Sequence, residues 1–308
     1  MGTVIKMISV SKPLFRFISA GSIELSAQAA KLCVGAAGIN PCDIGLLINT
    51  GIYRHKNTGE PAIAAMIQKR IGANSVKINK VNSSINTFKS TFSFDLNNGG
   101  CGWLSAIQIA DGLLQTGEID NGMIVTADSE PFKGLSENFK FEAAAAAIIL
   151  SKNEDPVGFS SFRSYSYTEH NEEFTSNTHF GHVHGKWGKK NILSVRQQES
   201  YLDSCIDRSL ESLDKFLDET GLHLNEIGLI IASQSPDGLI PGLKKRTGLN
   251  EKLVETGRTG KKELHTAGPA FALKKAWDDN SFMTSKNILF LSVGAGINVS
   301  FAIYRNQI

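Results

Sequence analysis

The strongest restriction on the fold is a helix-turn-strand unit that occurs once in each half of the chain. It covers Ala29–Gly51 (AAKLCVGAAGINPCDIGLLINTG) and again Leu213–Ser235 (LDKFLDETGLHLNEIGLIIASQS). Each copy reads as an amphipathic helix that ends at a glycine, Gly38 or Gly221, followed by a short turn and an apolar strand. Glycine is favoured just after a helix because the backbone there takes a positive φ. The repeat predicts a duplicated α/β architecture rather than two unrelated domains.

The turns and strands of the two copies also correspond. An acid, Asp43 or Glu226, stands in each turn, and the residues Ile-Gly-Leu follow it in both copies. The strands are apolar throughout, as strands buried on both faces should be. We therefore expect each copy to place one strand inside a sheet that is covered on both sides.

Further helices and strands are predicted between and after the two copies. Apolar periodicity indicates helices over 104–116, 200–219 and 269–278, and strands over 121–128, 143–152 and, as two strands around a glycine turn, 286–305. The stretch 160–190 is polar, aromatic and aperiodic, and is expected to be an inserted loop between the halves, with a loop that contains short strands as the alternative. The chain is thus divided into an N-terminal half (1–160), an inserted loop region (161–195) and a C-terminal half (196–308).

Composition limits the classes of partner. Of the 308 residues, 41% are hydrophobic and 20% are charged, which is ordinary for a soluble globular protein. The net charge of +2 is too small to indicate nucleic-acid binding. No apolar run of the roughly 18 residues needed to span a bilayer occurs, and the first residues lack the long apolar core of a signal peptide. We expect a cytoplasmic protein that binds neither nucleic acid nor membrane.

The cysteines and histidines do not form a metal-binding pattern. The four cysteines are widely spaced, with no CxxC pair, which favours free thiols in a reducing compartment. His179, His182 and His184 are close in sequence, but no acidic or cysteine partner stands at a ligand spacing. We expect a polar loop there, and neither a metal nor another bound cofactor.

One short stretch suggests chemistry. NNGGCGW (Asn97–Trp103) places Cys101 between a strand-like run and an amphipathic run. A cysteine at a helix N-terminus is a typical thiolate nucleophile, because the unpaired N–H groups and the helix dipole lower its pKa. The alternative is a small buried residue at a tight turn, since free cysteines are commonly buried and inert. The residues alone leave both interpretations open.

The order of these pieces resembles the thiolase superfamily, and within it the ketoacyl synthase III type. The family pattern Asp-x-x-x-x-Cys-x-Gly-Phe, followed by a helix of the form x-x-Ala-x-x-x-Ala-Asp, corresponds to DLNNGGCGWLSAIQIADGLLQTG from Asp95. Later matches are FEAAAAAIIL from Phe141, KKRTGL from Lys244 and GAGI from Gly294. The resemblance covers most of the chain. It implies a five-layered αβαβα sandwich built from two similar halves, usually as a dimer.

The same resemblance implies acyl transfer. In the family, a cysteine at the buried N-terminus of a helix takes an acyl group from coenzyme A or from a carrier protein. His and Asn side chains then donate hydrogen bonds to the thioester oxygen. The substrates implied are thioesters of coenzyme A or of the phosphopantetheine of an acyl carrier protein, in a fatty-acid or polyketide-like specialised pathway.

Three positions of this sequence depart from the family pattern. An ungapped alignment puts Gly100 at the nucleophile position, with Cys101 one residue later, which is about 100° around a helix. The additional glycine would permit a bulge that returns Cys101 to its place. Ser233 stands where the family has His, and a serine cannot act as a base near neutral pH. His265 stands where the family has Asn, and His265-Thr266 resembles the Gly-His-Thr of condensing enzymes with two catalytic histidines.

Site residues follow from these correspondences. We predict Cys101 as the acyl-accepting nucleophile, His265 as a hydrogen-bond donor or base, and Ser233 as a third residue of the site. Backbone N–H groups at Gly294 and Gly296 are expected to shape the oxyanion region.

A basic cluster, Lys244, Lys245 and Arg246, is expected to bind an acidic acyl carrier protein. The family's segment that clamps the coenzyme A adenine has no counterpart here, which favours a carrier protein as donor. A solvated helix end is the alternative for these three residues.

Two functions of different class remain open. The first is an acyltransferase of the ketoacyl synthase III type that works through a cysteine. The second is a catalytically inactive subunit that keeps the fold and pairs with an active paralogue. The sequence does not decide the acyl donor, the acceptor, or whether the dimer is homomeric or heteromeric.

Overall fold

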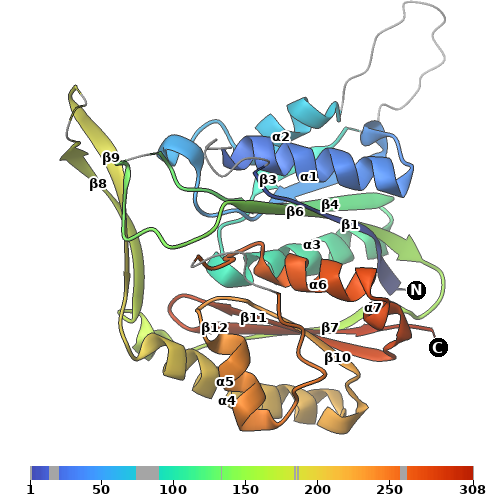
Figure 1. Ribbon diagram of the computed structural model, residues 1–308. Coiled ribbons are helices and arrows are strands. Elements are labelled where there is room, and N and C mark those ends of the chain that lie inside the picture. The colour runs from blue at the N-terminus through green and yellow to red at the C-terminus, as the bar shows by residue number, and fades with distance from the viewer. Residues whose placement is uncertain are drawn as a thin grey trace, which may run out of the picture.

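The computed structural model describes residues 2–13, 21–73, 90–132, 134–183, 185, 187–256 and 262–307. Figure 1 shows five layers, in which two sheets alternate with three layers of helices. The predicted αβαβα sandwich of two similar halves is confirmed.

The sheet of the N-terminal half is mostly apolar and buried. Its strands, in spatial order, are β1 (Gly2–Ser11), β6 (Ala144–Asn153), β4 (Asn121–Asp128), β2 (Leu46–Asn49) and β3 (Phe92–Asp95). The strand β2 pairs in parallel with β3 and β4, and β6 runs antiparallel to β1 and β4. Parallel pairing places the ends of β2, β3 and β4 at one edge of the sheet.

The sheet of the C-terminal half has four strands. They are β7 (Gly158–Ser166), β12 (Asn298–Arg305), β11 (Asn287–Gly294) and β10 (Leu229–Ala232), with β10 and β11 parallel. One residue pair, Thr3 with Phe159, links β1 to β7, so that hydrogen bonding joins both sheets into one nine-stranded set.

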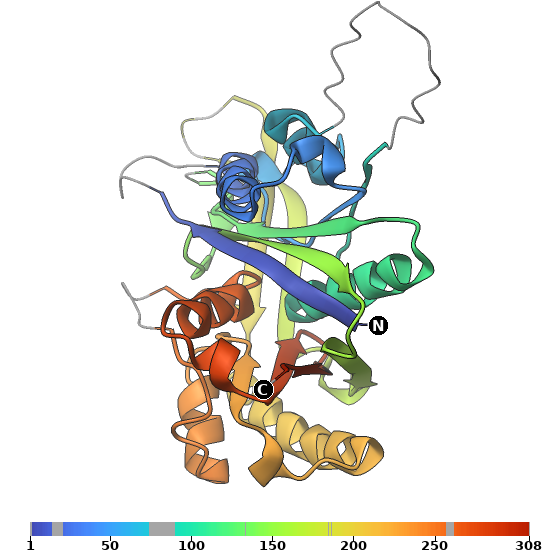
Figure 2. The ribbon, with the colours of Figure 1, turned by 90° about the vertical axis from the view of Figure 1, so that its right-hand side faces the viewer.

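The helices form the outer and inner layers. The outer helices of the N-terminal half are α1 (Ser22–Ala37) and α2 (Ile63–Ile71), and those of the C-terminal half are α4 (Tyr201–Thr220) and α5 (Leu239–Thr247). The inner layer holds α3 (Gly102–Thr116), α6 (Gly268–Asp278) and the short α7 (Ser281–Thr284). In Figures 1 and 2, α3 and α6 lie between the two sheets. None of the described helices is both long and apolar enough to cross a bilayer.

The repeat seen in the sequence is a structural repeat. Gly38 ends α1 with φ 64°, and Gly221 ends α4 with φ 65°. Short 3-10 turns follow, η1 (Pro41–Asp43) and η5 (Leu224–Glu226), each closed by its acid. An Asp43 oxygen lies 3.2 Å from the Asn40 nitrogen, and a Glu226 oxygen lies 2.8 Å from the His223 nitrogen. The two acids therefore hold the same turn in both halves.

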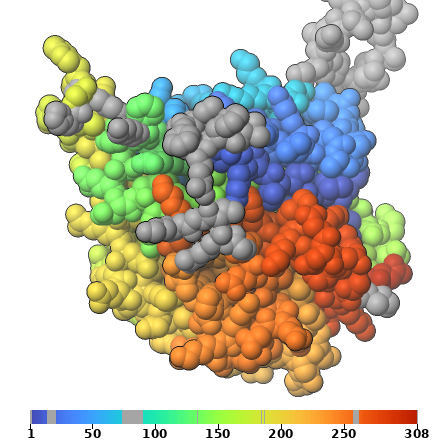
Figure 3. Space-filling view, viewed as in Figure 1, coloured from blue at the N-terminus to red at the C-terminus, as the bar shows by residue number. Residues whose placement is uncertain are grey.

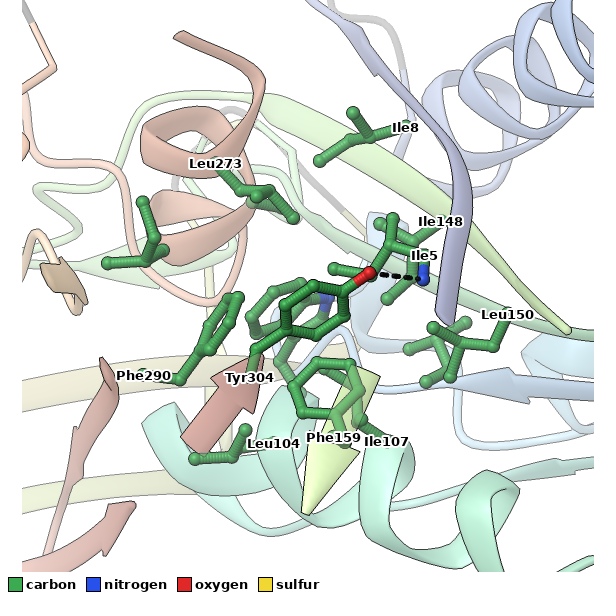
Figure 4. Close-up of a cluster of buried hydrophobic side chains, with 14 of the residues drawn as sticks. Ile5, Ile8, Leu104, Ile107, Ile148, Leu150, Phe159, Leu273, Phe290 and Tyr304 are labelled. Carbon is green, nitrogen blue, oxygen red and sulfur yellow. Dashed lines mark hydrogen bonds between the residues drawn. The ribbon is translucent and has the colours of Figure 1, made fainter. Parts of the chain in front are cut away.

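The inner layer is the centre of the hydrophobic core. Figure 4 shows side chains from both sheets meeting those of α3 and α6 there. The Tyr304 hydroxyl on β12 accepts a hydrogen bond from the Ile5 nitrogen on β1 at 3.4 Å. Because this core draws on both halves, neither sheet is expected to fold without the other.

The predicted inserted loop over 161–195 is wrong. Its first residues belong to β7, which is a full member of the C-terminal sheet. A short turn, η4 (Thr168–His170), leads to two nine-residue strands, β8 (Phe174–His182) and β9 (Lys189–Gln197). These strands pair as an antiparallel hairpin, with the short β5 (Ser136–Glu137) along β9.

Candidate functional site

A pocket of about 160 Å³ lies where the two halves meet. It is lined from the segments that follow β2, β3 and β10, from the end of β11, from the start of α4 and from β8. The carboxyl ends of parallel strands are the usual place for a binding site in α/β folds. Ser233, His265 and Gly294 are among the lining residues, so the structure brings these predicted site residues together.

His265 and Asp128 form the polar centre of this pocket. Nδ1 of His265 lies 2.9 Å from Oδ2 of Asp128. Asp128 ends β4, and His265 precedes α6, so the pair joins two distant parts of the chain. A carboxylate on Nδ1 fixes the orientation and tautomer of an imidazole. The basic nitrogen is then Nε2, on the opposite edge of the ring.

The hydrogen bonds of Asp128 stabilise its ionised form. Its Oδ1 accepts the backbone N–H groups of Ile52 at 2.9 Å and Tyr53 at 2.8 Å. Its Oδ2 accepts from the Thr266 nitrogen at 3.0 Å and hydroxyl at 2.6 Å. Burial alone would raise the pKa of Asp128, but the charge of His265 and these hydrogen bonds outweigh burial and lower that pKa.

Two aromatic rings hold the imidazole in place. The ring of Phe141 lies 4.5 Å from that of His265, and the ring of Tyr53 lies 5.1 Å away, measured between centroids. The His265 side chain keeps 12% of its surface exposed. Burial raises the pKa of the Tyr53 hydroxyl, which therefore stays protonated. The ring of His265 is thus fixed on one edge and accessible on the pocket side.

Ser233 lines the pocket but is also a structural link. Its side-chain oxygen accepts the Val293 N–H at 3.0 Å, and its own nitrogen donates to the Leu291 carbonyl at 2.9 Å. These bonds tie the end of β10 to β11. Among the described residues, neither hydrogen-bond partner of this buried serine is a base, so Ser233 is better suited to positioning than to proton transfer.

Cys101 does not reach the pocket. Its thiol is fully buried and lies 3.2 Å from the Asn298 carbonyl and 3.5 Å from the Ser292 carbonyl, to which it donates. Burial raises its pKa to about 11. A thiol with so high a pKa is protonated near pH 7, and the protonated form is not the nucleophile. This is opposite to the expected activation, and the predicted role of Cys101 as the nucleophile is not supported by its position.

Alkylation of the native protein is expected to leave Cys101 unmodified. Cys33, Cys101 and Cys205 are buried, whereas Cys42 is partly exposed. Iodoacetamide should therefore react at Cys42 first, and at the other three only in denaturant. Peptide mass spectrometry after timed labelling measures the order. Faster labelling at Cys101 than at Cys42 would restore it as a candidate nucleophile.

Gly100 occupies the place that the family alignment gives to the nucleophile. It lines the pocket together with Gly99, whose φ is 49°. A Cβ atom on Gly100 would lie 2.1 Å from the Val293 carbonyl oxygen. The end of β11 therefore leaves no room for a side chain at this position, and the glycines do not form the bulge that would turn Cys101 inward.

Replacing Gly100 with Ala is expected to lower the free energy of unfolding by about 2–3 kcal/mol, because the added methyl group meets backbone. The matched control is Gly112→Ala on the exposed face of α3, where nothing lies within 4 Å of the new Cβ. That change should raise the free energy of unfolding by roughly 0.5–1 kcal/mol. Urea denaturation of both variants measures the difference, and equal stability of the two would contradict the close approach of β11.

Of the two glycines predicted to shape the oxyanion region, only one lines the pocket. Gly294 lines the pocket, and a Cβ there would lie 3.3 Å from the Gly100 nitrogen and 3.4 Å from the Cys101 sulfur. Its lack of a side chain keeps the floor of the pocket open. Gly296 has φ 71° and a turn role, and is not among the residues that line the pocket in the described part of the chain.

The basic cluster lies in the last turn of α5, outside the lining of this pocket. Lys244 pairs with Glu255 at 3.1 Å, and Arg246 pairs with Asp207. These two charges are therefore partly neutralised within the chain. Carrier binding by Lys244, Lys245 and Arg246 stays a prediction.

The histidine cluster does not assemble. His179 and His182 project from opposite faces of β8, since residues of odd and even number alternate along a strand. His184 lies outside the described residues. In the described part of the chain, no three His, Cys, Asp or Glu side chains are placed to hold a metal ion.

Sequence reasoning missed Asp128 and Tyr53. A signal for Asp128 was present, because it is the one acid in the strand NGMIVTAD and it stands at the carboxyl end. Acids in such positions commonly serve a site at the edge of the sheet. Tyr53 carries no comparable signal, since its role depends on stacking against Phe141 at 4.9 Å.

Comparison with known sequences shows what this chain is similar to. The family model of 3-oxoacyl-[acyl-carrier-protein (ACP)] synthase III matches residues 94–168. The beta-ketoacyl-[acyl-carrier-protein] synthase III of Clostridium perfringens is 22% identical over 292 residues, which is 92% of this chain and 84% of that protein. The Aquifex aeolicus protein of the same name is 20% identical over 285 residues, with 91% and 83% covered.

Solved structures show the same fold. The 3-oxoacyl-[acyl-carrier-protein] synthase III of Aquifex aeolicus superposes with a TM-score of 0.78 at 18% identity, covering 99% of this chain and 100% of that one. A Xanthomonas campestris OleA variant, solved with bound lauric acid and lauroyl-CoA, gives a TM-score of 0.76 at 17% identity and 99% coverage of both chains.

Proposed function

We propose that this chain, which resembles ketoacyl synthase III of the thiolase superfamily, transfers a short acyl group from a thioester without a cysteine nucleophile. The observation that carries the proposal is the His265–Asp128 pair, which is fixed at 2.9 Å in a pocket whose nucleophile position is glycine. The donor would be an acyl carrier protein thioester, as the name of the Clostridium perfringens relative suggests, or a coenzyme A thioester, as the lauroyl-CoA bound to the OleA variant suggests.

The chemistry needs a base and an acceptor bound beside the thioester. Nε2 of His265 takes the proton of an acceptor hydroxyl, amine or water as its heteroatom attacks the thioester carbonyl carbon. The carbon–sulfur bond breaks, and the protonated His265 returns the proton to the leaving thiolate. Asp128 stabilises the imidazolium that forms between these steps. Acyl transfer is then complete with no covalent intermediate on the protein.

The size of the pocket supports a short acyl group. A cavity of about 150 Å³ is just large enough for benzene, and this pocket has about 160 Å³. Acyl chains of roughly two to six carbons fit such a volume, whereas a lauroyl chain does not. We therefore expect acetyl and butyryl thioesters to be better donors than lauroyl thioesters.

A second candidate is the inactive subunit that pairs with an active paralogue. The observation that favours it is that, among the described residues, no thiol lines the pocket: Gly100 has no side chain, and Cys101 is buried and points to the carbonyl of Asn298. In this case the chain would complete the site or the acceptor tunnel of its partner and have no turnover alone.

One experiment separates the alternatives. The purified chain is incubated with acetyl, butyryl and lauroyl thioesters of coenzyme A and of an acyl carrier protein, with Cys101→Ala alongside. Turnover of the short thioesters by both proteins, with no acyl adduct in the intact mass, supports direct transfer. An adduct that Cys101→Ala abolishes would instead establish a cysteine mechanism. No turnover and no adduct would favour the inactive subunit.

A further inference from the structure

The turn end of the β8–β9 hairpin projects from the body of the protein. Figure 1 shows the hairpin along one side of the molecule with its turn beyond the layers, and Figure 3 shows the same end standing out at the upper left. The base of the hairpin is packed, since Leu193 and Val195 are buried against Tyr53 and Phe141. The base is therefore rigid, and the tip is presented to the surroundings.

Two large aromatic side chains are exposed at this tip. Trp187 is 98% exposed and Phe180 is 66% exposed. The strand register pairs Phe180 with Asn191 and His182 with Lys189, while His179 is paired with the buried Ile192. Paired residues share a face of a hairpin, and the faces alternate along each strand. Phe180, His182 and Lys189 therefore share one face of the hairpin, and this face is exposed at the tip and buried only nearer the base, where Leu193 lies opposite Thr178.

The hairpin sequence contains basic residues and no acidic ones. Residues 174–197 include Lys186, Lys189, Lys190 and Arg196, and no Asp or Glu. The whole chain, by contrast, has 32 Lys and Arg against 30 Asp and Glu. A strand pair free of acids within such a balanced chain is a local positive surface, which fits a negatively charged partner.

We infer that this tip, formed by Phe180, Trp187, Lys189 and Lys190, binds an anionic lipid surface. Tryptophan and other aromatic side chains are favoured at the boundary of a bilayer, and lysines beside them are attracted to acidic headgroups. A convex two-stranded tip is poorly shaped for a protein partner, because a stable interface needs about 800 Å² on each side. A bilayer accepts a convex tip by insertion. Such a contact needs no membrane span, and it departs from the sequence-based expectation that the protein binds no membrane.

The inference does not rest on the proposed function. The inference is related to the proposed function in one respect, because Phe174 and Ser176 at the base of β8 line the pocket. A hairpin held at a lipid surface would keep the pocket at a fixed distance from that surface.

Tryptophan fluorescence tests the inference directly. The chain has three Trp residues, and Trp103 is buried. Vesicles of phosphatidylcholine with phosphatidylglycerol should shift the emission of the full chain to shorter wavelength and cosediment with it, whereas pure phosphatidylcholine should do so much less. Trp187→Ser should remove the shift. It should also weaken binding to the vesicles at least about tenfold, which corresponds to the free energy of burying one aromatic side chain. Lys189→Glu with Lys190→Glu should weaken it by at least about 25-fold, at roughly fivefold for each charge.

A matched control uses the opposite side of the molecule. Met283 on α7 is 41% exposed and Lys286 lies nearby, and Met283→Ser with Lys286→Glu should leave vesicle binding unchanged. Absence of binding to anionic vesicles, or equal binding by the hairpin variants, would overturn the inference. Two further results would overturn it. A shift of the Trp187 emission on raising the protein concentration without lipid would indicate that the tip binds a second copy of the chain. A shift only on adding an acidic carrier protein would indicate that the tip binds that protein.

Discussion

Replacing His265 with Asn is expected to lower kcat for short-acyl transfer by about 10²–10⁴-fold, the usual contribution of a general base. The Asn side chain can still donate to Asp128 from the place of Nδ1, which lies 2.9 Å from that carboxylate. It has no basic nitrogen at the place of Nε2. The variant therefore separates the structural bond from the proton transfer, and KM should change little.

Steady-state rates across pH, with a second histidine as the control, make this test specific. His170 also bonds a carboxylate through Nδ1, at 2.8 Å from Glu173, but it does not line the pocket among the described residues. His170→Asn should keep both the rate and its pH dependence. His265→Asn should lose the rise of the rate with pH that marks a base. If the two variants were equally active, His265 would have no part in proton transfer, and the pair with Asp128 would be structural.

The architecture of this chain was predictable because its two halves repeat one local pattern. Gly38 and Gly221 end helices, and Asp43 and Glu226 close the turns that follow. Equivalent residues in the two halves therefore indicate the same local structure. Apolar strands such as β4 were found with their bounds, since burial on both faces leaves a continuous apolar run.

The hairpin and the orientation of Cys101 were not predictable in this way. The strands β8 and β9 carry polar, glycine and histidine residues without alternation, because much of the hairpin has no buried face. Their pairing depends on contacts distant in sequence. The direction of the Cys101 thiol depends on one residue of rotation, and that rotation is set by the approach of Val293 to Gly100. Neither is a property of the local sequence.

Removing the Asp128 carboxylate is expected to have the largest effect on stability. Asp128→Ala leaves the N–H groups of Ile52, Tyr53 and Thr266 without their acceptor in a buried site. The loss of such a buried network typically costs about 3–5 kcal/mol of the free energy of unfolding. Asp128→Asn keeps the shape and one carbonyl oxygen, so a smaller loss is expected. Asp214→Asn, on the exposed face of α4, is the control and should change stability by less than about 0.5 kcal/mol.

The dependence on pH identifies the carboxylate itself as the cause. Since the pKa of Asp128 is lower in the folded chain than in the unfolded one, its ionised form stabilises the fold above the unfolded value of about 3.9. This contribution is lost as pH falls through the folded pKa, where the carboxylate gains its proton. Asp128→Asn has no such proton to gain. Urea denaturation at pH 7 and at successively lower pH should therefore show the stabilities of the parent and of Asp128→Asn converging as the pH falls. A constant difference between them would mean that Asp128 is already protonated in the folded protein, and His265 would then lack the charged partner that the proposed mechanism requires.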